Sequence, residues 1–346
     1  MRTGVLSFVL MLGVCTSAVA GPAGKPADHA YRIVDRYRLG GTEGWDYLAV
    51  DAQRQRLFIS RSDHVAVIDA NSGKLIGEIP GTLGVHGIAL APDLKRGYTS
   101  NGRAGTVTAF DLDTLKVLDQ VKVTGANPDA IVYDPATKRV FTFNGNSDNA
   151  TAIDAASLKV VGTIALPGKP EFAVSDGHGR VYVNIEDKSE LAVINPASAQ
   201  VVTTWPLAPC EEPSGLAMDI AHQRLFSVCA NHRMMVLDAQ SGHRVAEMPI
   251  GEHPDAAAFD PASQLAFSSN GEGTLTIVHE DDADHFSVVA NVPTRKSART
   301  MALDTATHRI YLSSAETGPR PKPTAEQPHP RPVIAPDTFE ILVLGQ

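Results

Sequence analysis

The stretch PDAIVYDPATKRVFTFNG, residues Pro128–Gly145, has a near copy in PDAAAFDPASQLAFSSNG, residues Pro254–Gly271. Nine of the eighteen positions are identical, and the two copies begin 126 residues apart. This interval equals three units of about 42 residues, a length that several repeat architectures use. The sequence therefore predicts a repeat protein, with two further units between the quoted ones.

Five more segments carry the same pattern and begin at Trp45, Val85, Pro170, Pro213 and Ala298. Each unit holds short runs rich in Val, Ile and Thr between turns that contain Asp, Asn, Gly or Pro, which is typical of strands. Four strands recurring every 40 to 44 residues are the signature of propeller blades. The sequence thus predicts an all-β, seven-bladed β-propeller with four-stranded blades, forming a single domain over residues 31–346.

The two ends of this domain indicate how the ring closes. The seventh unit ends with its third strand, TFEILVLG, at residues 338–345 and has no fourth strand. The segment YRIVDRYRL, residues 31–39, has strand character but belongs to no unit. We expect this N-terminal strand to complete the seventh blade, since that pairing removes an exposed sheet edge.

The residues before the propeller resemble an export signal. Arg2 precedes the apolar run VLSFVLMLGV, and SAVA ends at Ala20 with small residues suited to cleavage. We expect a signal peptide over residues 1–20, cleavage after Ala20, a linker over residues 21–30, and a periplasmic or secreted product. No later run reaches the 18 apolar residues of a membrane span, and a net charge of -9 disfavours nucleic-acid binding.

Blade sequences such as DPATKRVFTFNGNSDNATAIDAASLKVVGTIALPGKP, residues Asp134–Pro170, resemble the YVTN repeat of YncE-like exported propellers. The YVTN motif itself is represented by YVNI at residues 182–185 and FTFN at residues 141–144. The resemblance extends over the whole mature chain. It implies a propeller in a family that mostly lacks an assigned reaction, so function has to be argued from the site.

The repeat also fixes which side chains meet at the channel. The residue that enters each first strand and the one that leaves each second strand should lie opposite each other on one face. We therefore predict a ligand-binding ring formed by Asp46, Arg61, His86, Asn101, Asp129, Asn144, Glu171, Asn184, Asp255, Asn270 and Arg299.

This ring permits two interpretations. Converging carboxylates and amides suit one divalent cation, calcium above all, and the candidate ligands are Asp129, Glu171, Asp255, Asn144 and Asn270. With His86 as the base, such a site would make a metal-dependent lactonase or hydrolase. Alternatively the ring only binds water, and the Asn–Gly pairs only form turns.

Two further features bear on the same face. Cys210 and Cys229 should both lie there in the fifth blade, which predicts a disulfide; the alternative is a soft-metal site that includes His232. Residues 317–337 hold seven prolines in 21 residues, and this insertion, about residues 318–337, interrupts the seventh blade. Its position predicts either a lid over the channel or a solvated loop.

The leading functional hypothesis is an exported binding module. It would bind a small molecule, an ion or a partner protein through the polar face of its channel, and we expect it to be a monomer. The hydrolase is the alternative. A redox accessory subunit is the least supported, because no C-x-x-C-H haem motif occurs.

Overall fold

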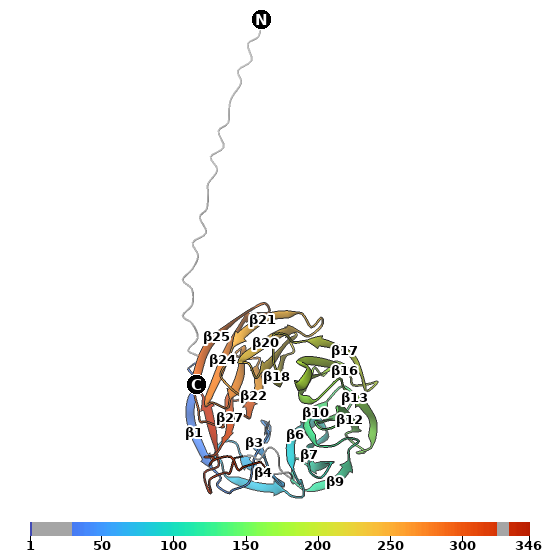
Figure 1. The fold of residues 1–346 in the computed structure, drawn as a ribbon, viewed down its shortest axis with the longest axis vertical. Coiled ribbons are helices and arrows are strands. Elements are labelled where there is room, and N and C mark those ends of the chain that lie inside the picture. Colours follow the sequence, from blue (N-terminus) through green and yellow to red (C-terminus); the bar gives the residue numbers. More distant parts are fainter. Residues whose placement is uncertain (2–29, 324–331) are drawn as a thin grey trace.

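The protein is described by a computed structural model that covers residues 1, 30–323 and 332–346. Its strands form seven four-stranded antiparallel sheets arranged as a ring around a central axis (Figure 1). This arrangement confirms the predicted seven-bladed β-propeller. Within the described residues the only helical elements are two 3-10 turns, η1 (Pro92–Leu94) and η2 (Glu186–Lys188). No helix there has the length and hydropathy needed to cross a bilayer.

Blades one to six follow chain order from the channel outward. Blades one to three comprise β2 (Leu48–Asp51), β3 (Arg56–Arg61), β4 (His64–Asp69) and β5 (Leu75–Ile79), then β6 (Val85–Ala91), β7 (Arg96–Asn101), β8 (Thr106–Asp111) and β9 (Val117–Lys122), then β10 (Pro128–Asp134), β11 (Arg139–Asn144), β12 (Asn149–Asp154) and β13 (Val160–Ala165). Blades four to six comprise β14 (Pro170–Ser175), β15 (Val181–Ile185), β16 (Glu190–Asn195) and β17 (Gln200–Pro206), then β18 (Pro213–Asp219), β19 (Arg224–Cys229), β20 (Arg233–Asp238) and β21 (Arg244–Pro249), then β22 (Pro254–Asp260), β23 (Leu265–Asn270), β24 (Thr274–Asp282) and β25 (His285–Pro293).

The seventh blade is closed by the N-terminal strand, as predicted. Its strand order is β1-β28-β27-β26, formed by β1 (Arg32–Arg38), β28 (Glu340–Gly345), β27 (Arg309–Ser314) and β26 (Met301–Asp304). The hydroxyl of Tyr37 donates to the Ala70 carbonyl of blade one at 3.1 Å, and the ring of Tyr31 meets Phe267 of blade six at 5.3 Å. Strand β1 therefore ties blade seven to both neighbouring blades.

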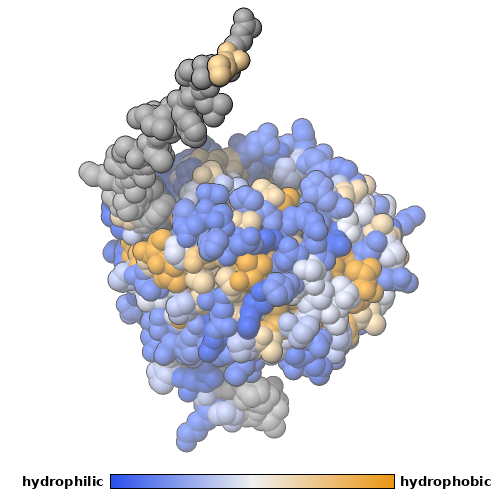
Figure 2. All heavy atoms as spheres, turned by 90° about the horizontal axis from the view of Figure 1, so that it is seen from above, coloured by the Kyte–Doolittle hydropathy of each residue, from blue (hydrophilic) through white to orange (hydrophobic). Residues whose placement is uncertain are grey.

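The core lies between the blades because the two middle strands of each sheet are buried on both faces. Strands β8, β12 and β20 share the pattern of four buried residues between two partly buried ends. The outer strands are more exposed, and apolar pairs at the start of β5 and β9 reach solvent. Figure 2, which looks onto the side of the ring, shows such apolar patches within a largely hydrophilic surface.

Cys210 and Cys229 form the predicted disulfide, with their Cα atoms 5.4 Å apart. The alternative of a soft-metal site built from both thiolates is therefore wrong. The predicted signal peptide, its cleavage after Ala20 and the linker over residues 21–30 lie outside the described residues, apart from Met1 and Ala30.

Candidate functional site

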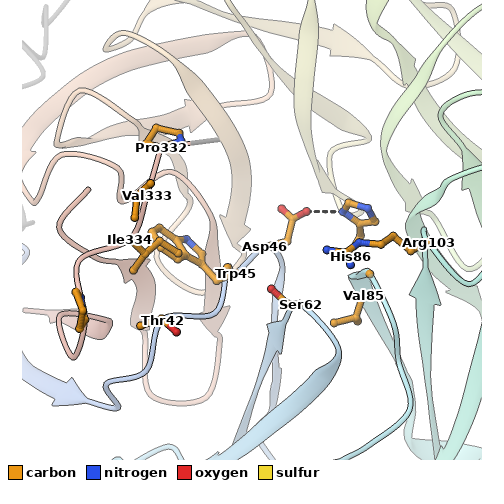
Figure 3. Close-up of a pocket in the computed structure, with 13 residues that line it drawn as sticks. Thr42, Trp45, Asp46, Ser62, Val85, His86, Arg103, Pro332, Val333 and Ile334 are labelled. Carbon is orange, nitrogen blue, oxygen red and sulfur yellow. Dashed lines mark hydrogen bonds and ion pairs between the residues drawn. The ribbon is translucent and has the colours of Figure 1, made fainter. Parts of the chain in front are cut away.

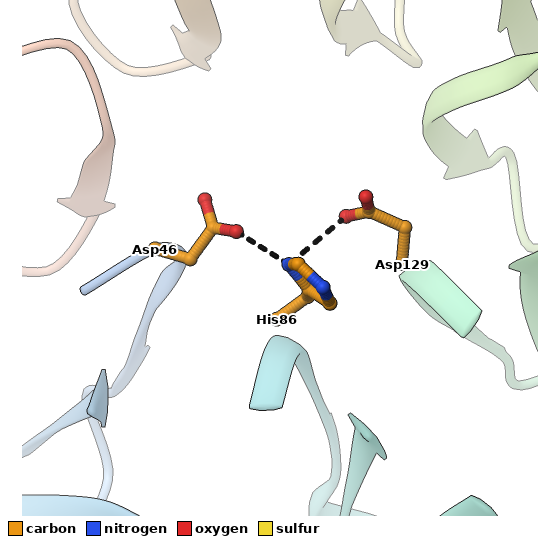
Figure 4. A group of neighbouring side chains, drawn as sticks. All are labelled: Asp46, His86 and Asp129. Carbon is orange, nitrogen blue, oxygen red and sulfur yellow. Dashed lines mark hydrogen bonds and ion pairs between the residues drawn. The ribbon is translucent and has the colours of Figure 1, made fainter. Parts of the chain in front are cut away.

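The residues that enter the first strands gather on one face of the ring, which we call the top face. His86 lies between two carboxylates of the neighbouring blades (Figure 4). Its Nδ1 is 2.6 Å from Oδ2 of Asp46 and 3.7 Å from Oδ1 of Asp129. One donor atom from each of the three side chains lies within 4.8 Å of the others. We call this group the Asp46–His86–Asp129 cluster.

Serine side chains hold these entry points in place. In blade one, the backbone N–H of Asp46 donates to Oγ of Ser60 at 3.1 Å, and that hydroxyl donates to the Tyr47 carbonyl at 3.0 Å. In blade two, the N–H of Gly87 donates to Oγ of Ser100 at 2.9 Å, and Ser100 donates to the Asp129 carbonyl. In blades one and two, a serine of the second strand thus bonds the backbone at the start of the first strand of the same blade. Ser100 of blade two also bonds the backbone at the start of blade three.

The other two carboxylates of the predicted ring, those of Asp255 and Glu171, lie beside cationic side chains. The guanidinium of Arg299 donates to Oδ2 of Asp255 at 2.5 Å. The ammonium of Lys169 lies 2.8 Å from Oε1 of Glu171 and also contacts Glu186. Lys169 was not among the predicted residues, although it immediately precedes the fourth first strand. The Asp46–His86–Asp129 cluster differs from these pairs because two carboxylates there share one imidazole.

Two aromatic rings meet across the channel beneath this ring of charges. Tyr47 of blade one stacks on Phe172 of blade four, with ring centroids 4.5 Å apart and planes inclined by 28°. Burial, together with the negative charges of Asp129 and Glu171, raises the pKa of the Tyr47 hydroxyl well above its ordinary value. The stack gives the polar mouth an aromatic floor.

The sequence contained a signal for this floor that the prediction overlooked. The residue after the entry position is small or hydroxylated in five blades and aromatic only in blades one and four; the five are Gly87, Ala130, Gly215, Ala256 and Thr300. A Cβ on Gly215 would come within 2.6 Å of the backbone of the next blade. Large side chains are therefore exceptional there, and two of them indicate a contact across the channel.

The asparagines that leave the second strands do not reach the mouth. Asn101, Asn144 and Asn270 are fully buried, and each carboxamide donates to side chains of the third strand of its own blade. These side chains point into the sheet, because the second strand is covered on both faces. The carboxamides of Asn144 and Asn270, two of the predicted calcium ligands, therefore lie inside their own blades, and their role as ligands stays a prediction.

Asn184 and Arg61 are also engaged elsewhere. The amide of Asn184 donates to the Ser214 carbonyl at 2.9 Å and so joins blades four and five. The guanidinium of Arg61 bonds Glu43 at 2.9 Å and lies 3.9 Å above the ring of Phe339. Arg61, a predicted member of the ligand-binding ring, thus anchors the loop before β2.

Two cavities open on the top face on either side of Trp45. The larger, about 680 Å³, is lined by Trp45, Asp46, His86 and Arg103 and by residues 332–334 and 336 of the proline-rich insertion (Figure 3). The smaller, about 380 Å³, extends over Arg299. Arg103 lies in the turn after β7 and carried no signal in the repeat pattern, so its contribution was not predicted.

The base of the proline-rich insertion is ordered against the top face. The N–H of Gly318 donates to the Val333 carbonyl at 2.7 Å, and the N–H of Ala335 donates to the Glu316 carbonyl at 2.8 Å. Val333 and Ile334 then line the larger cavity. The base of the insertion therefore forms one wall of the larger cavity. Residues 324–331, which are part of the predicted lid, lie outside the described residues.

Comparisons with known proteins identify the fold. No family model matches the chain, and no curated protein matches it. A chain of hydrazine synthase from Kuenenia stuttgartiensis is 19% identical, with a TM-score of 0.68 over 78% of this chain and 92% of that one. The WD40 repeats of RRP9 are 10% identical, with a TM-score of 0.75 over 92% and 99%. A chain of the mitotic checkpoint complex is 14% identical, with a TM-score of 0.73 over 100% and 99%.

At these identities the likeness concerns the β-propeller fold alone. Propellers of one architecture serve unrelated functions, so the neighbours assign neither ligand nor reaction. The YVTN-type resemblance remains a prediction from the sequence.

Replacing Glu171 should alter how stability depends on pH. Burial and the negative charge of Asp129 raise the pKa of Glu171 to about 8, although Lys169 opposes the shift. The folded state therefore holds this proton more tightly than the unfolded chain, and its stability falls as pH rises from about 4.5 to about 8. Glu171→Gln keeps the neutral shape, so it should be more stable than the wild type at pH 9 and similar at pH 5.

Urea denaturation at pH 5, 7 and 9 measures this effect, which we expect to be on the order of a few kcal/mol between the extremes. Glu78→Gln, at an exposed glutamate on the outer strand β5, is the matched control and should keep the wild-type profile. Identical pH profiles for the two variants would contradict the assignment.

Proposed function

We propose that this protein is an exported binding propeller whose top-face mouth takes a small ligand bearing a positive group. The supporting observation is the Asp46–His86–Asp129 cluster at the edge of a cavity of about 680 Å³. Export is proposed from the N-terminal sequence and from the resemblance to YVTN-repeat propellers, and the disulfide is compatible with an oxidising compartment.

The charge at the cluster favours a cation over an anion. Two carboxylates, those of Asp46 and Asp129, flank one imidazole there. The guanidinium of Arg299 interacts mainly with Asp255 and less with Asp46. The indole of Trp45 lines the same cavity, and aromatic faces attract organic cations. An amine or quaternary ammonium placed between Trp45 and Asp46 would use both contacts.

Asp46→Asn should weaken binding of such a ligand. The probes are a panel of alkylamines, tetramethylammonium and a polyamine, and the readout is the rise in melting temperature at increasing ligand concentration. We expect at least one member to stabilise the wild type and to lose most of that effect in Asp46→Asn. Asp119→Asn, which removes the same charge from the exposed strand β9, is the control and should behave as the wild type.

A divalent-metal hydrolase is the second candidate, and a specific observation favours it. The cluster presents one imidazole and two carboxylates within 4.8 Å, a donor set that suits zinc better than calcium. His86 would then be a ligand rather than the predicted base. Binding of one Zn²⁺ that requires Asp129, together with hydrolysis of a simple lactone, would support this candidate; Zn²⁺ binding that is unaffected in Asp129→Asn would exclude it.

A further inference from the structure

A second cluster of carboxylates and imidazole lies on the opposite face, where blades five and six meet. It consists of Asp219 at the end of β18, His222 in the following turn, and Glu280 in β24 of the next blade. Nδ1 of His222 is 2.8 Å from Oδ2 of Asp219 and 3.1 Å from Oε1 of Glu280. One donor atom of each side chain lies within 4.8 Å of the other two.

The contact between Asp219 and His222 belongs to the fold. The residue three positions after the strand-ending Asp caps that carboxylate in other blades too: Thr137 donates to Asp134, and Ser263 donates to Asp260 at 2.7 Å. His222 occupies this capping position in blade five. Its imidazole replaces a hydroxyl, so the pair alone needs no ligand to explain it.

Glu280, in contrast, has no structural role that the repeat requires. Its N–H donates to the Gln264 carbonyl at 2.9 Å, which is the bond that an apolar residue makes at the same place in four other blades; these residues are Ala70, Leu112, Ala155 and Ala239. Blade six thus places a carboxylate where its counterparts place a methyl or isobutyl group. The repeat itself shows that the fold is satisfied without it.

The carboxylate of Glu280 is also incompletely satisfied. Its side chain is fully buried, and Oε2 has no hydrogen-bond partner among the described residues. A buried unpaired carboxylate oxygen is strongly unfavourable unless a proton or a cation joins it. Burial and the charge of Asp219 raise the pKa of Glu280 to about 7, so a proton is the competing occupant.

The guanidinium of Arg224, in the strand after His222, bonds groups other than the side chains of the cluster. Arg224 directs its side chain to the carbonyls of His222 and Ala283 and to the carboxylates of Asp238 and Asp284. The side chain of His222 is 40% exposed, which leaves a path from solvent to the buried carboxylates.

We propose that Asp219, His222 and Glu280 bind a divalent transition-metal ion, of which Zn²⁺ is the representative, at the junction of blades five and six. Donor atoms around a tetrahedral zinc ion with bonds of about 2.0 Å are roughly 3.3 Å apart, close to the two separations measured at His222. An imidazole nitrogen among three donors favours zinc over calcium or magnesium. Solvent would supply the fourth ligand on the exposed side. This site is independent of the function proposed for the top face.

The test uses substitutions that restore what the other blades contain, so that folding is preserved. Protein stripped with a chelator is titrated with Zn²⁺ against a chromophoric competitor, for the wild type, Glu280→Ala and His222→Thr. We expect the wild type to bind one Zn²⁺ that both variants bind at least tenfold more weakly. His86→Gln, in the top-face cluster, and His285→Gln, at an exposed histidine paired with Asp282, should both retain this Zn²⁺.

Melting curves with and without Zn²⁺ distinguish metal from proton. Zn²⁺ should raise the melting temperature of the wild type and leave that of Glu280→Ala unchanged. Equal Zn²⁺ affinity in the wild type and Glu280→Ala would overturn the proposal. It would equally be overturned if Zn²⁺ had no effect on the wild type while Glu280→Ala was more stable under all conditions, because a shared proton would then account for the cluster.

Discussion

A chain that begins at Leu39 should fail to form a closed ring, whereas a chain that begins at Ala30 should fold as the full-length protein does. The first truncation removes β1 and exposes the edge of β28, which pairs with β1 from Arg32↔Gly345 to Arg38↔Glu340. It also removes Tyr31 and Tyr37, two aromatic side chains that are only 5% and 6% exposed.

The expected loss of unfolding free energy is large compared with the total unfolding free energy of a typical domain. Deleting one buried aromatic side chain destabilises a protein by about 3 to 5 kcal/mol, against a total of about 5 to 15 kcal/mol. Circular dichroism melts and gel filtration of the two truncated chains measure the outcome. A cooperative melt within a few degrees of the wild type for the chain from Leu39 would contradict the role assigned to β1.

Removing the disulfide should cause the second large effect. Cys210 and Cys229 are 19 residues apart, and a bridge over a loop of this size contributes about 3 kcal/mol by restricting the unfolded chain. The double variant Cys210→Ala, Cys229→Ala should therefore melt several degrees below the wild type. Cys210 and Cys229 lie in the apolar cluster beside Leu207 and Leu216, so the two alanines of the variant are compatible with their surroundings.

Reduction of the wild type provides the control. Dithiothreitol should lower the melting temperature of the wild type towards that of the double variant and should not affect the double variant itself. A double variant as stable as the oxidised wild type would show that the bridge contributes nothing to stability.

The fold could be predicted from the sequence because the same pattern of four strands and their turns recurs in seven units. Copies such as Pro128–Gly145 fix the blade boundaries, and the unpaired segment at residues 31–39 has only one place to pair. The Cys210–Cys229 bridge followed from the same register, since both positions were placed on one face of one blade. These features depend on backbone periodicity, which a single sequence displays directly.

The site was predicted only in part, because the repeat does not say which way a side chain points. Asp46, His86 and Asp129 do converge, since the entry into each first strand faces the channel. Asn101, Asn144 and Asn270 turn into the sheet instead, where their carboxamide N–H groups donate to hydroxyl groups of the third strand. Departures from the repeat were more informative than its regular positions.

Two departures show this. The aromatic pair Tyr47 and Phe172 stands where other blades place small or hydroxylated residues, and it forms the floor of the mouth. Glu280 stands where other blades place an apolar residue, and its carboxylate is buried without a partner for one oxygen among the described residues. Both could be found by aligning the seven units and asking which residue the fold does not need.

The proposed cation site at the channel mouth can be tested by calorimetric titration of the most stabilising amine into the wild type, Asp46→Asn and Asp119→Asn. We expect one binding site in the wild type, unchanged affinity in Asp119→Asn, and affinity at least tenfold weaker in Asp46→Asn, since a charge-assisted contact contributes about 1.5 to 3 kcal/mol. Equal affinity in all three proteins would place the ligand away from the channel mouth and would exclude this site.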